Sequence, residues 1–216
     1  MSPSEGAPPR LLLIGAGGHG RAVLSALRDA GWPEPIGVLD DGGAALPGVP
    51  CLGPVSHAAA LRPEAAAAHV ALGSNALRMR LGAELLALGF ALPVIRHPSA
   101  VIAADAVLGP GTVAMPRVVV GAAARIGAHV ILNTACIAEH DCAVEDGCHI
   151  APGAVLGGGV FVGEGALVGI QAGLRPGTRV GAGAVVALGA AVVADVPPRA
   201  TVAGVPARMA AASRPA

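Results

Sequence analysis

The sequence has almost no aromatic residues: one Trp, two Phe and no Tyr among 216 residues. Since 54% of the residues are nevertheless hydrophobic, the core must consist of Ala, Val, Leu and Ile. Such side chains suit narrow, repeated layers. The chain also contains 32 Gly and 19 Pro, and in so apolar a sequence these do not indicate disorder.

Other absences narrow the function classes. The charges balance at 14 of each sign, whereas nonspecific nucleic-acid binding needs a basic surplus. No apolar run reaches the roughly 18 residues of a membrane helix, and Leu11–Ile14 is too short for a signal-peptide core. The four cysteines form no CxxC pair. We therefore expect a cytoplasmic enzyme or binding protein that binds neither nucleic acid nor membrane.

From Ile102 onward the sequence repeats every six residues. Counting from Ile102, sixteen consecutive first places are aliphatic, from Ile102 to Val192, and sixteen fifth places are small or β-branched, from Ala106 to Val196. Seven second places are Gly. A period of six fits neither an α-helix nor an alternating strand, but it is typical of a β-solenoid. The pattern resembles the left-handed parallel β-helix of hexapeptide-repeat acyltransferases, and sixteen hexads predict about five triangular coils.

The first hundred residues read differently, as alternating strands and helices. We expect a strand at 11–14, a glycine-rich loop at 15–20, a helix ending near Arg28, strands at 35–40 and 69–72, helices at 56–61 and 75–88, and a closing segment at 90–95. This alternation predicts a truncated Rossmann-like α/β domain. The expected domains are 1–97 and 98–216, the second comprising the β-helix and a C-terminal tail.

The glycine-rich loop is the first candidate site. Gly15, Gly17 and Gly20 form a GxGxxG pattern between a strand and a helix, where backbone N–H groups can bind a phosphate. Asp40 lies twenty residues beyond Gly20, where a ribose-binding acid would stand. The alternative interpretation is a tight strand–helix turn. His19 has two interpretations: it contacts a phosphate or sugar at this helix end, or it simply packs against the protein.

Two histidines of the repeat, His140 and His149, occupy outward-facing places. Asp141 follows His140 directly, and a carboxylate bonded to one ring nitrogen raises the basicity of the other. On spacing alone, a solvated surface histidine is the simpler interpretation. Cys136, Cys142 and Cys148 are six residues apart, but all three fall in the inward fifth place, which favours packing over a metal cluster or a redox relay.

Several further motifs occur in one order along nearly the whole chain: LIGAGGHG at 13–20, Leu39-Asp40-Asp41, Leu72-Gly-Ser-Asn75, His97-Pro-Ser-Ala100, Leu132-Asn-Thr134, Glu139-His140-Asp141 and Val202-Ala-Gly-Val-Pro-Ala-Arg208. Together they resemble the bacterial sugar O- and N-acetyltransferases of the sialic-acid acetyltransferase type. The most similar members acetylate the amine of a nucleotide-linked 4-amino-6-deoxy sugar, such as a bacillosamine precursor or GDP-perosamine. Such a reaction serves surface polysaccharide, including lipopolysaccharide, or glycan synthesis.

The resemblance implies roles for individual residues. His140 corresponds to the catalytic base and Asp141 to the carboxylate that modulates it. His149, with Gly169, Ile170, Leu188 and Gly189, corresponds to the acetyl-CoA site, and Gly17, Gly18, His19, Asp40, Asp41 and Gly73 correspond to the nucleotide-sugar site. The resemblance further implies a homotrimer with active sites between subunits, acetyl-CoA as cosubstrate and no metal. It does not fix the nucleotide.

Four alternatives remain open. An O-acetyltransferase would act on a sialic acid or another sugar hydroxyl. A γ-type carbonic anhydrase would bind zinc through a pair of histidines five residues apart, whereas His140 and His149 are nine apart. A non-catalytic solenoid, such as an ice-binding, scaffold or nucleotide-binding protein, would leave the His–Asp pair unexplained, and ice binding would need outward threonines, whereas Thr112 and Thr178 face inward. An NAD-binding regulator depends on the glycine loop alone.

Overall fold

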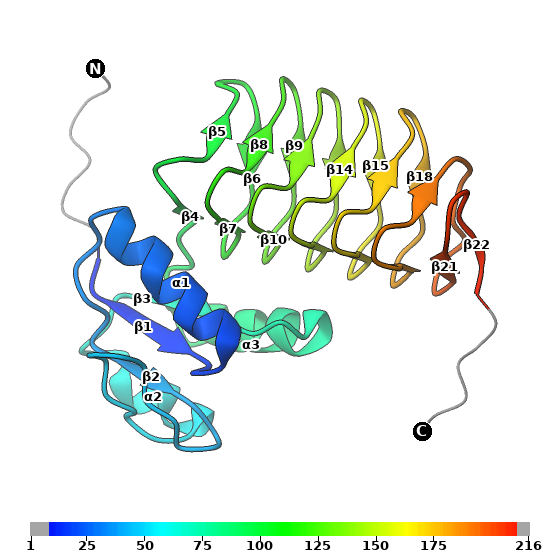
Figure 1. Cartoon of the computed structure of the whole chain (residues 1–216). Helices are drawn as coiled ribbons and strands as arrows, with labels where there is room; N and C mark the ends of the chain where they lie inside the picture. Colours follow the sequence, from blue (N-terminus) through cyan, green and yellow to red (C-terminus); the bar gives the residue numbers. More distant parts are fainter. Residues whose placement is uncertain (1–8, 211–216) are drawn as a thin grey trace. The chain divides into compact units, whose positions relative to one another are not determined.

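The computed structural model describes residues 9–210, so the outer ends of the two expected domains, residues 1–8 and 211–216, lie outside the described residues. The chain divides between Pro93 and Val94 into two compact units (Figure 1). The division falls shortly before the expected boundary at His97, because Ile95–Arg96 already pairs, as strand β4, with the solenoid strand β7 (Val113–Ala114).

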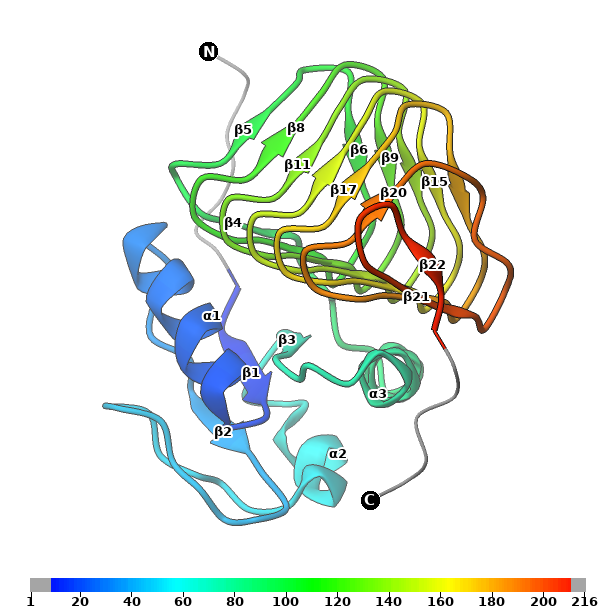
Figure 2. The ribbon, with the colours of Figure 1, turned by 45° about the vertical axis from the view of Figure 1, so that its right-hand side comes forward.

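The N-terminal unit is a three-stranded parallel sheet in the order β2–β1–β3. Figure 2 shows α1 on one face of this sheet and α2 and α3 on the other, as right-handed crossovers from a central first strand require. Its elements are β1 (Leu11–Ile14), α1 (Gly18–Asp29), β2 (Gly37–Leu39), the 3-10 turn η1 (Val55–His57), α2 (Ala58–Leu61), β3 (Ala67–Val70) and α3 (Asn75–Ala87). The truncated Rossmann-like arrangement is thus confirmed.

Two segments of this unit differ from the expectation. Strand β3 begins at Ala67 rather than His69, because Ala67 and Ala68 are themselves buried and pair with Leu11 and Leu12. Residues 90–95 do not form one strand: Ala91 makes an isolated bridge to Ala67, and the following pairing belongs to the solenoid. Local side-chain patterns carry no information about such distant pairing partners.

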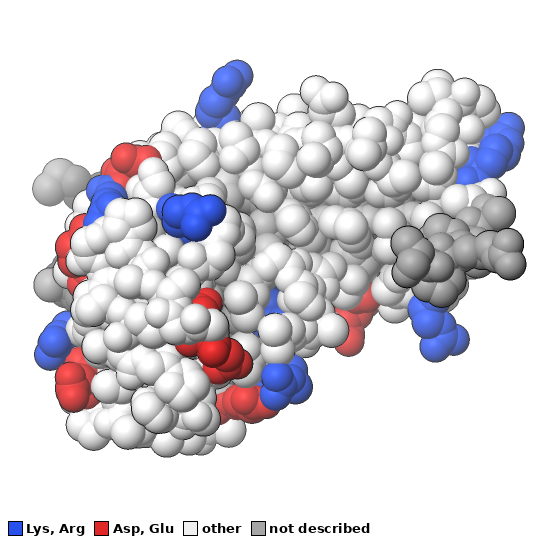
Figure 3. Space-filling view, turned by 60° about the horizontal axis from the view of Figure 1, so that its bottom comes forward, with Lys and Arg blue, Asp and Glu red and all other residues white. Residues whose placement is uncertain are grey.

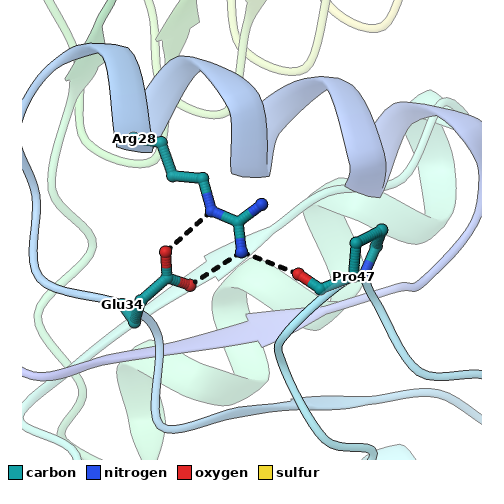
Figure 4. Close-up of polar contacts among 3 residues, drawn as sticks. All are labelled: Arg28, Glu34 and Pro47. Carbon is teal, nitrogen blue, oxygen red and sulfur yellow. Dashed lines mark hydrogen bonds and ion pairs between the residues drawn. The ribbon is translucent and has the colours of Figure 1, made fainter.

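Helix ends in this unit are fixed by side chains. Ser74 caps α3, where its Oγ accepts a hydrogen bond from the N–H of Leu77. In the last turn of α1, Figure 4 shows Arg28 hydrogen-bonded to both carboxylate oxygens of Glu34 and to the carbonyl oxygen of Pro47. The distances are 2.7 and 3.1 Å to Glu34 and 2.7 Å to Pro47. The hydrogen bond from Arg28 lowers the pKa of Glu34. Arg28 thereby ties the helix to the segment that follows Asp40 and Asp41.

The second unit is a triangular β-solenoid with three parallel sheets along its sides (Figures 1 and 2). The first sheet contains β4, β7, β10 (Ile131–Leu132), β13 (His149–Ile150), β16 (Leu167–Val168), β19 (Val185–Val186), β21 (Thr201–Ala203) and β22 (Arg208–Met209). The second contains β5 (Val101–Ile102), β8 (Val119–Val120), β11 (Ile137–Ala138), β14 (Val155–Leu156), β17 (Gly173–Leu174) and β20 (Ala191–Val192). The third contains β6 (Val107–Leu108), β9 (Arg125–Ile126), β12 (Ala143–Val144), β15 (Phe161–Val162) and β18 (Arg179–Val180).

The hexad register predicts the inside of the solenoid. First-place and fifth-place residues are buried from Thr112 onward, and only the first coil, with Ile102, Ala106 and Leu108, leaves them partly exposed. The solenoid has about six turns rather than five, because β4 and β21 extend it beyond the counted hexads. The predicted fold class, a Rossmann-like domain followed by a left-handed parallel β-helix, is confirmed.

Glycine serves two purposes in the coils. At second places it allows close stacking: a Cβ on Gly169 would lie 2.6 Å from the backbone nitrogen of Leu188 in the next coil. At fourth places the backbone is left-handed, which favours Gly, Asn and Asp. Asp141 occupies such a place with a φ of 60°.

The repeat cysteines lie inside the solenoid. Cys136, Cys142 and Cys148 are at most 1% exposed, and the thiols of Cys142 and Cys148 donate to the carbonyl oxygens of Gly157 and Gly163. Burial raises the pKa of Cys136 to about 12. These thiols therefore act as small core side chains.

The charges on one face of the molecule are of mixed sign. On the face drawn in Figure 3, acidic and basic side chains are scattered rather than gathered into one patch. Among the helices of residues 9–210, none is long and apolar enough to cross a membrane. At the C-terminal end, β22 pairs antiparallel with β21 and closes the first sheet.

Candidate active site

His140 stands at the solenoid corner between β11 and β12, where the second and third sheets meet. Its Nδ1 is 2.7 Å from Oδ2 of Asp141, and both side chains are about two-thirds exposed. This hydrogen bond, followed by the charge of Asp141, raises the pKa of His140. Because Asp141 accepts the proton of Nδ1, the neutral ring presents Nε2 as its basic atom.

Gly158, eighteen residues and one coil beyond His140, makes room for the imidazole. A Cβ on Gly158 would lie 2.5 Å from Nε2 of His140 and 2.6 Å from Cε1. Gly157 has a different role, since its Cβ would meet Pro176, and Gly159 has a positive φ of 68°. Sequence reasoning missed Gly158, although its spacing of eighteen from His140 is a usable signal.

His149 lies on the first sheet, on a different side of the solenoid from His140. Its Nε2 is 3.0 Å from Nδ2 of Asn133, whose Oδ1 in turn accepts the N–H of Thr134 at 2.8 Å. That second bond orients the amide, so Nδ2 donates and Nε2 of His149 accepts. Asn133 thus fixes the orientation of the His149 ring. Asn133 is a second residue that sequence reasoning left without a role.

Exposed aliphatic side chains follow the corner after the first sheet. Ile170 and Leu188 stand one coil apart, 50% and 76% exposed, and the N–H of Gly189 donates to the carbonyl oxygen of Ile170 at 2.7 Å. Val205, which is 77% exposed, comes shortly after β21, a strand of the first sheet. The structure therefore brings Gly169, Ile170, Leu188 and Gly189 together, and it adds Val205.

The N-terminal unit has a cavity of about 480 Å³ at the carboxyl ends of its strands, the edge where ligands bind in open α/β sheets. Gly15, Asp40 and Asp41 line it, whereas Gly17, Gly18, His19 and Gly73 do not. Asp40 accepts the N–H groups of Ala16 and Gly42, both at 2.9 Å, and the bond from Ala16 is the main cause of its lowered pKa. Asp41 accepts the N–H of Val55 at 2.9 Å.

Gly20 explains part of the glycine motif, because a Cβ there would collide with the carbonyl oxygen of Gly15. Near Gly73, the buried side chain of Arg78 on α3 donates to the carbonyl oxygens of Leu72 and Gly73 at 2.9 and 3.3 Å and to Oδ1 of Asn75. Arg78 therefore fixes the loop from β3 to α3. Nothing in the sequence pattern indicates this role, since a charged residue on a helix is normally expected to be exposed to solvent.

No metal-binding group of three or more His, Cys, Asp or Glu side chains is present in the part of the chain that the structure describes.

The comparisons with known proteins agree with this geometry. Residues 10–85 match the family of the PglD N-terminal domain. Perosamine N-acetyltransferase from Caulobacter crescentus, solved as a histidine-to-asparagine variant with CoA and GDP-perosamine, is 36% identical, with 98% of this chain and 100% of that chain covered and a TM-score of 0.90. No curated protein sequence matches the chain.

Two further solved structures span almost the same length. The acetyltransferase domain of PglB from Neisseria gonorrhoeae, in complex with acetyl coenzyme A, is 36% identical over 93% of this chain and 98% of that chain, with a TM-score of 0.87. WeeI from Acinetobacter baumannii is 27% identical over 93% and 99%, with a TM-score of 0.83. The chain belongs to the nucleotide-sugar N-acetyltransferases of the hexapeptide-repeat type, a family of CoA-dependent acyltransferases.

Proposed function

We propose that this chain transfers the acetyl group of acetyl-CoA to the 4-amino group of a nucleotide-linked amino-deoxy sugar. The observation that carries the proposal is the hydrogen-bonded pair of His140 and Asp141 at an exposed solenoid corner. It is supported by the full-length similarity to an enzyme solved with CoA and GDP-perosamine. Acetyl-CoA is a second substrate here rather than a resident cofactor.

In the reaction, the sugar amine attacks the thioester carbonyl, and a new C–N bond forms. Nε2 of His140 accepts the proton that the amine loses. When the C–S bond breaks, the CoA thiolate takes up that proton, and the base is regenerated. Asp141 holds the ring in the required tautomer and stabilises its protonated form, and general-base help of this kind contributes about 10²–10⁴ in rate.

Acetyl-CoA fits the corner that follows the first sheet of the solenoid. The exposed row of Ile170, Leu188 and Val205 offers apolar contact to a flexible pantetheine arm. We assign His149, which is hydrogen-bonded to Asn133, to the same substrate. Gly169 lets the next coil approach closely, and Gly189 adopts a left-handed backbone with a φ of 65°, so backbone groups of both residues can contact the arm.

The nucleotide sugar fits the N-terminal unit. Its cavity combines Gly15 with the carboxylates of Asp40 and Asp41, which can accept hydrogen bonds from the hydroxyl groups of a nucleotide. Gly17, Gly18, His19 and Gly73 remain proposed contacts, because they lie just beyond the carboxyl ends of β1 and β3: Gly17 caps α1, Gly18 and His19 begin it, and Gly73 lies in the loop after β3. The sugar would then be presented as its nucleotide-activated form.

We further propose a homotrimer with active sites between subunits. His140 and His149 lie on different sides of one solenoid, so a single copy does not bring both onto one surface. A neighbouring copy supplies the missing side. Because both substrates are cytoplasmic metabolites, we place the reaction in the cytoplasm, where it would serve surface polysaccharide or glycan synthesis.

A coenzyme-A release assay across nucleotide sugars tests the proposal. Each 4-amino sugar is paired with the analogue that carries a 4-hydroxyl group, such as GDP-perosamine with GDP-rhamnose. We expect release with an amine and little or none with the hydroxyl partner. Faster release with the hydroxyl sugar would instead establish an O-acetyltransferase, and no release with any amine would contradict the proposal.

A further inference from the structure

A second cavity adjoins the one that contains Asp40 and Asp41. Its volume is about 260 Å³, and the two cavities share Val55, Ser56, Leu81 and Glu84. They differ in chemistry, since the remaining lining of the second is wholly aliphatic: Ala58, Ala59, Leu85 and Leu88. The nucleoside part of a nucleotide has the same order of polarity, with the hydroxyl groups of the ribose at one end and a flat base at the other. The base therefore fits the aliphatic cavity.

Two charged side chains of α3 stand where the cavities meet. Arg80 lines the first cavity and Glu84 lines both. Nη1 of Arg80 is 2.8 Å from Oε1 of Glu84, and their side chains are 62% and 51% exposed, so each keeps hydrogen-bonding groups available. Exposed pairs one helical turn apart contribute little to stability. Their position at the junction of the two cavities lets their remaining hydrogen-bonding groups contact a ligand.

We propose that Arg80 and Glu84 read the edge of the base and select guanine. This inference rests on the proposed function for its nucleotide-sugar substrate. Side by side, the guanidinium and the carboxylate present a donor followed by two acceptors. Guanine presents the matching series: the O6 acceptor, the N1–H donor and the N2 amino donor.

The other bases of common sugar nucleotides do not match this series. Uracil and thymine present an acceptor, a donor and a second acceptor, so one carbonyl oxygen would face a carboxylate oxygen of Glu84. Buried or half-buried polar groups left without partners are costly, which is how a hydrogen-bonding site rejects a near-isostere. The site thus favours a GDP-linked substrate over UDP- and dTDP-linked ones.

Binding of nucleoside diphosphates to the full chain, measured by calorimetry without CoA, tests the assignment. Inosine diphosphate is the decisive probe, because inosine is guanosine without the N2 amino group. We expect GDP to bind about 10-fold more tightly than inosine diphosphate, and about 10- to 100-fold more tightly than UDP or dTDP. Equal binding of GDP and inosine diphosphate, or of GDP and UDP, would overturn the proposal.

Variants separate the two side chains. Glu84→Gln loses one of its two acceptors, so the preference for GDP over inosine diphosphate should fall to about 1- to 2-fold. Arg80→Gln should weaken both ligands alike, since both carry O6, and should leave their ratio unchanged. Glu64→Gln, an exposed glutamate of the same unit that lines neither cavity, is the matched control. A preserved ratio in Glu84→Gln contradicts the assignment.

The coenzyme-A release assay distinguishes a failure of the guanine assignment from a failure of the proposed function. If a UDP-linked amino sugar is the better substrate, the guanine assignment is wrong and the proposed function stands. If GDP shows the expected preference but no amino sugar releases coenzyme A, the guanine assignment stands and the proposed function is wrong.

Discussion

In the solenoid, the place of a residue within its hexad decides whether its side chain points inward or outward. In the N-terminal unit, the same decision depends on contacts between segments that lie far apart in the chain, such as Asp40 with Ala16 and Arg62 with Gly89. The solenoid therefore offers a fixed surface on which one substituted corner carries the proposed chemistry. The N-terminal unit contains the cavity that we propose for the nucleotide sugar.

This contrast predicts that solenoid changes lower turnover, whereas N-terminal changes weaken substrate binding. The largest effect is expected for His140→Asn, which removes the proton acceptor. We expect kcat to fall about 10²- to 10⁴-fold, with binding of the nucleotide sugar by calorimetry unchanged. His129→Asn is the control, as another corner histidine with a positive φ of 54° that Asn tolerates. Full turnover of His140→Asn at saturating substrates would remove His140 from the mechanism.

Gly158→Ala tests the same corner without touching the base itself. The added methyl group would lie 2.5 Å from Nε2 of His140, so the ring must move. Displacements of this size cost about 10- to 100-fold in kcat. Gly173→Ala is the matched control, because a methyl group there meets nothing within 4 Å. Equal activity of the two variants would show that Gly158 does not position the ring.

Arg78→Met tests the N-terminal unit. It removes the buried guanidinium and the hydrogen bonds that it donates to the carbonyl oxygens of Leu72 and Gly73, which should destabilise the protein by about 1–3 kcal/mol. The looser loop should raise KM for the nucleotide sugar and leave kcat at saturation close to that of the parent. Steady-state kinetics and thermal unfolding measure both, with the exposed Arg10→Met as control. A fall in kcat at constant KM would contradict the assignment of substrate binding to the N-terminal unit and of turnover to the solenoid.

The smallest expected effect is a shift in pH dependence. Asp141 raises the pKa of His140 above its ordinary value of 6.5. Because the ring acts as a base only when it is unprotonated, kcat/KM should rise with pH through that raised pKa. Asp141→Asn retains a residue that tolerates the left-handed backbone but removes the charge. The acidic limb of the pH profile should therefore move to lower pH. An unmoved limb would mean that the profile reports a different group.

The contrast also explains what could be predicted from the sequence. The hexad register indicated which residues are inward and which face out, and so set the cysteines apart from His140, Asp141 and His149. It could not separate the three glycines at 157–159, because close stacking, room for a ring and a left-handed backbone all demand the same residue.

In the N-terminal unit, the sequence indicated the strand–loop–helix start and Asp40, which are local. It did not indicate the cavity, whose walls come from loops after β1 and β2 and from one face of α3. Arg80 and Glu84 read as an ordinary exposed helical pair until the cavities on either side of them are known. Arg78 reads the same way, although its guanidinium is buried. Tertiary contacts, rather than residue type, assign these three side chains.

The antiparallel pairing of β22 with β21 has a consequence for assembly. A parallel solenoid ends in unpaired backbone groups that can template another copy, as any sheet edge can. Here the final strand of the first sheet runs against the others, with Val202 opposite Met209. A strand from another copy that pairs in parallel, as β4 does with β7, finds no parallel template at this edge. At this edge the first sheet therefore departs from the repeat, and a further coil does not find the parallel register that β19 offers to β21.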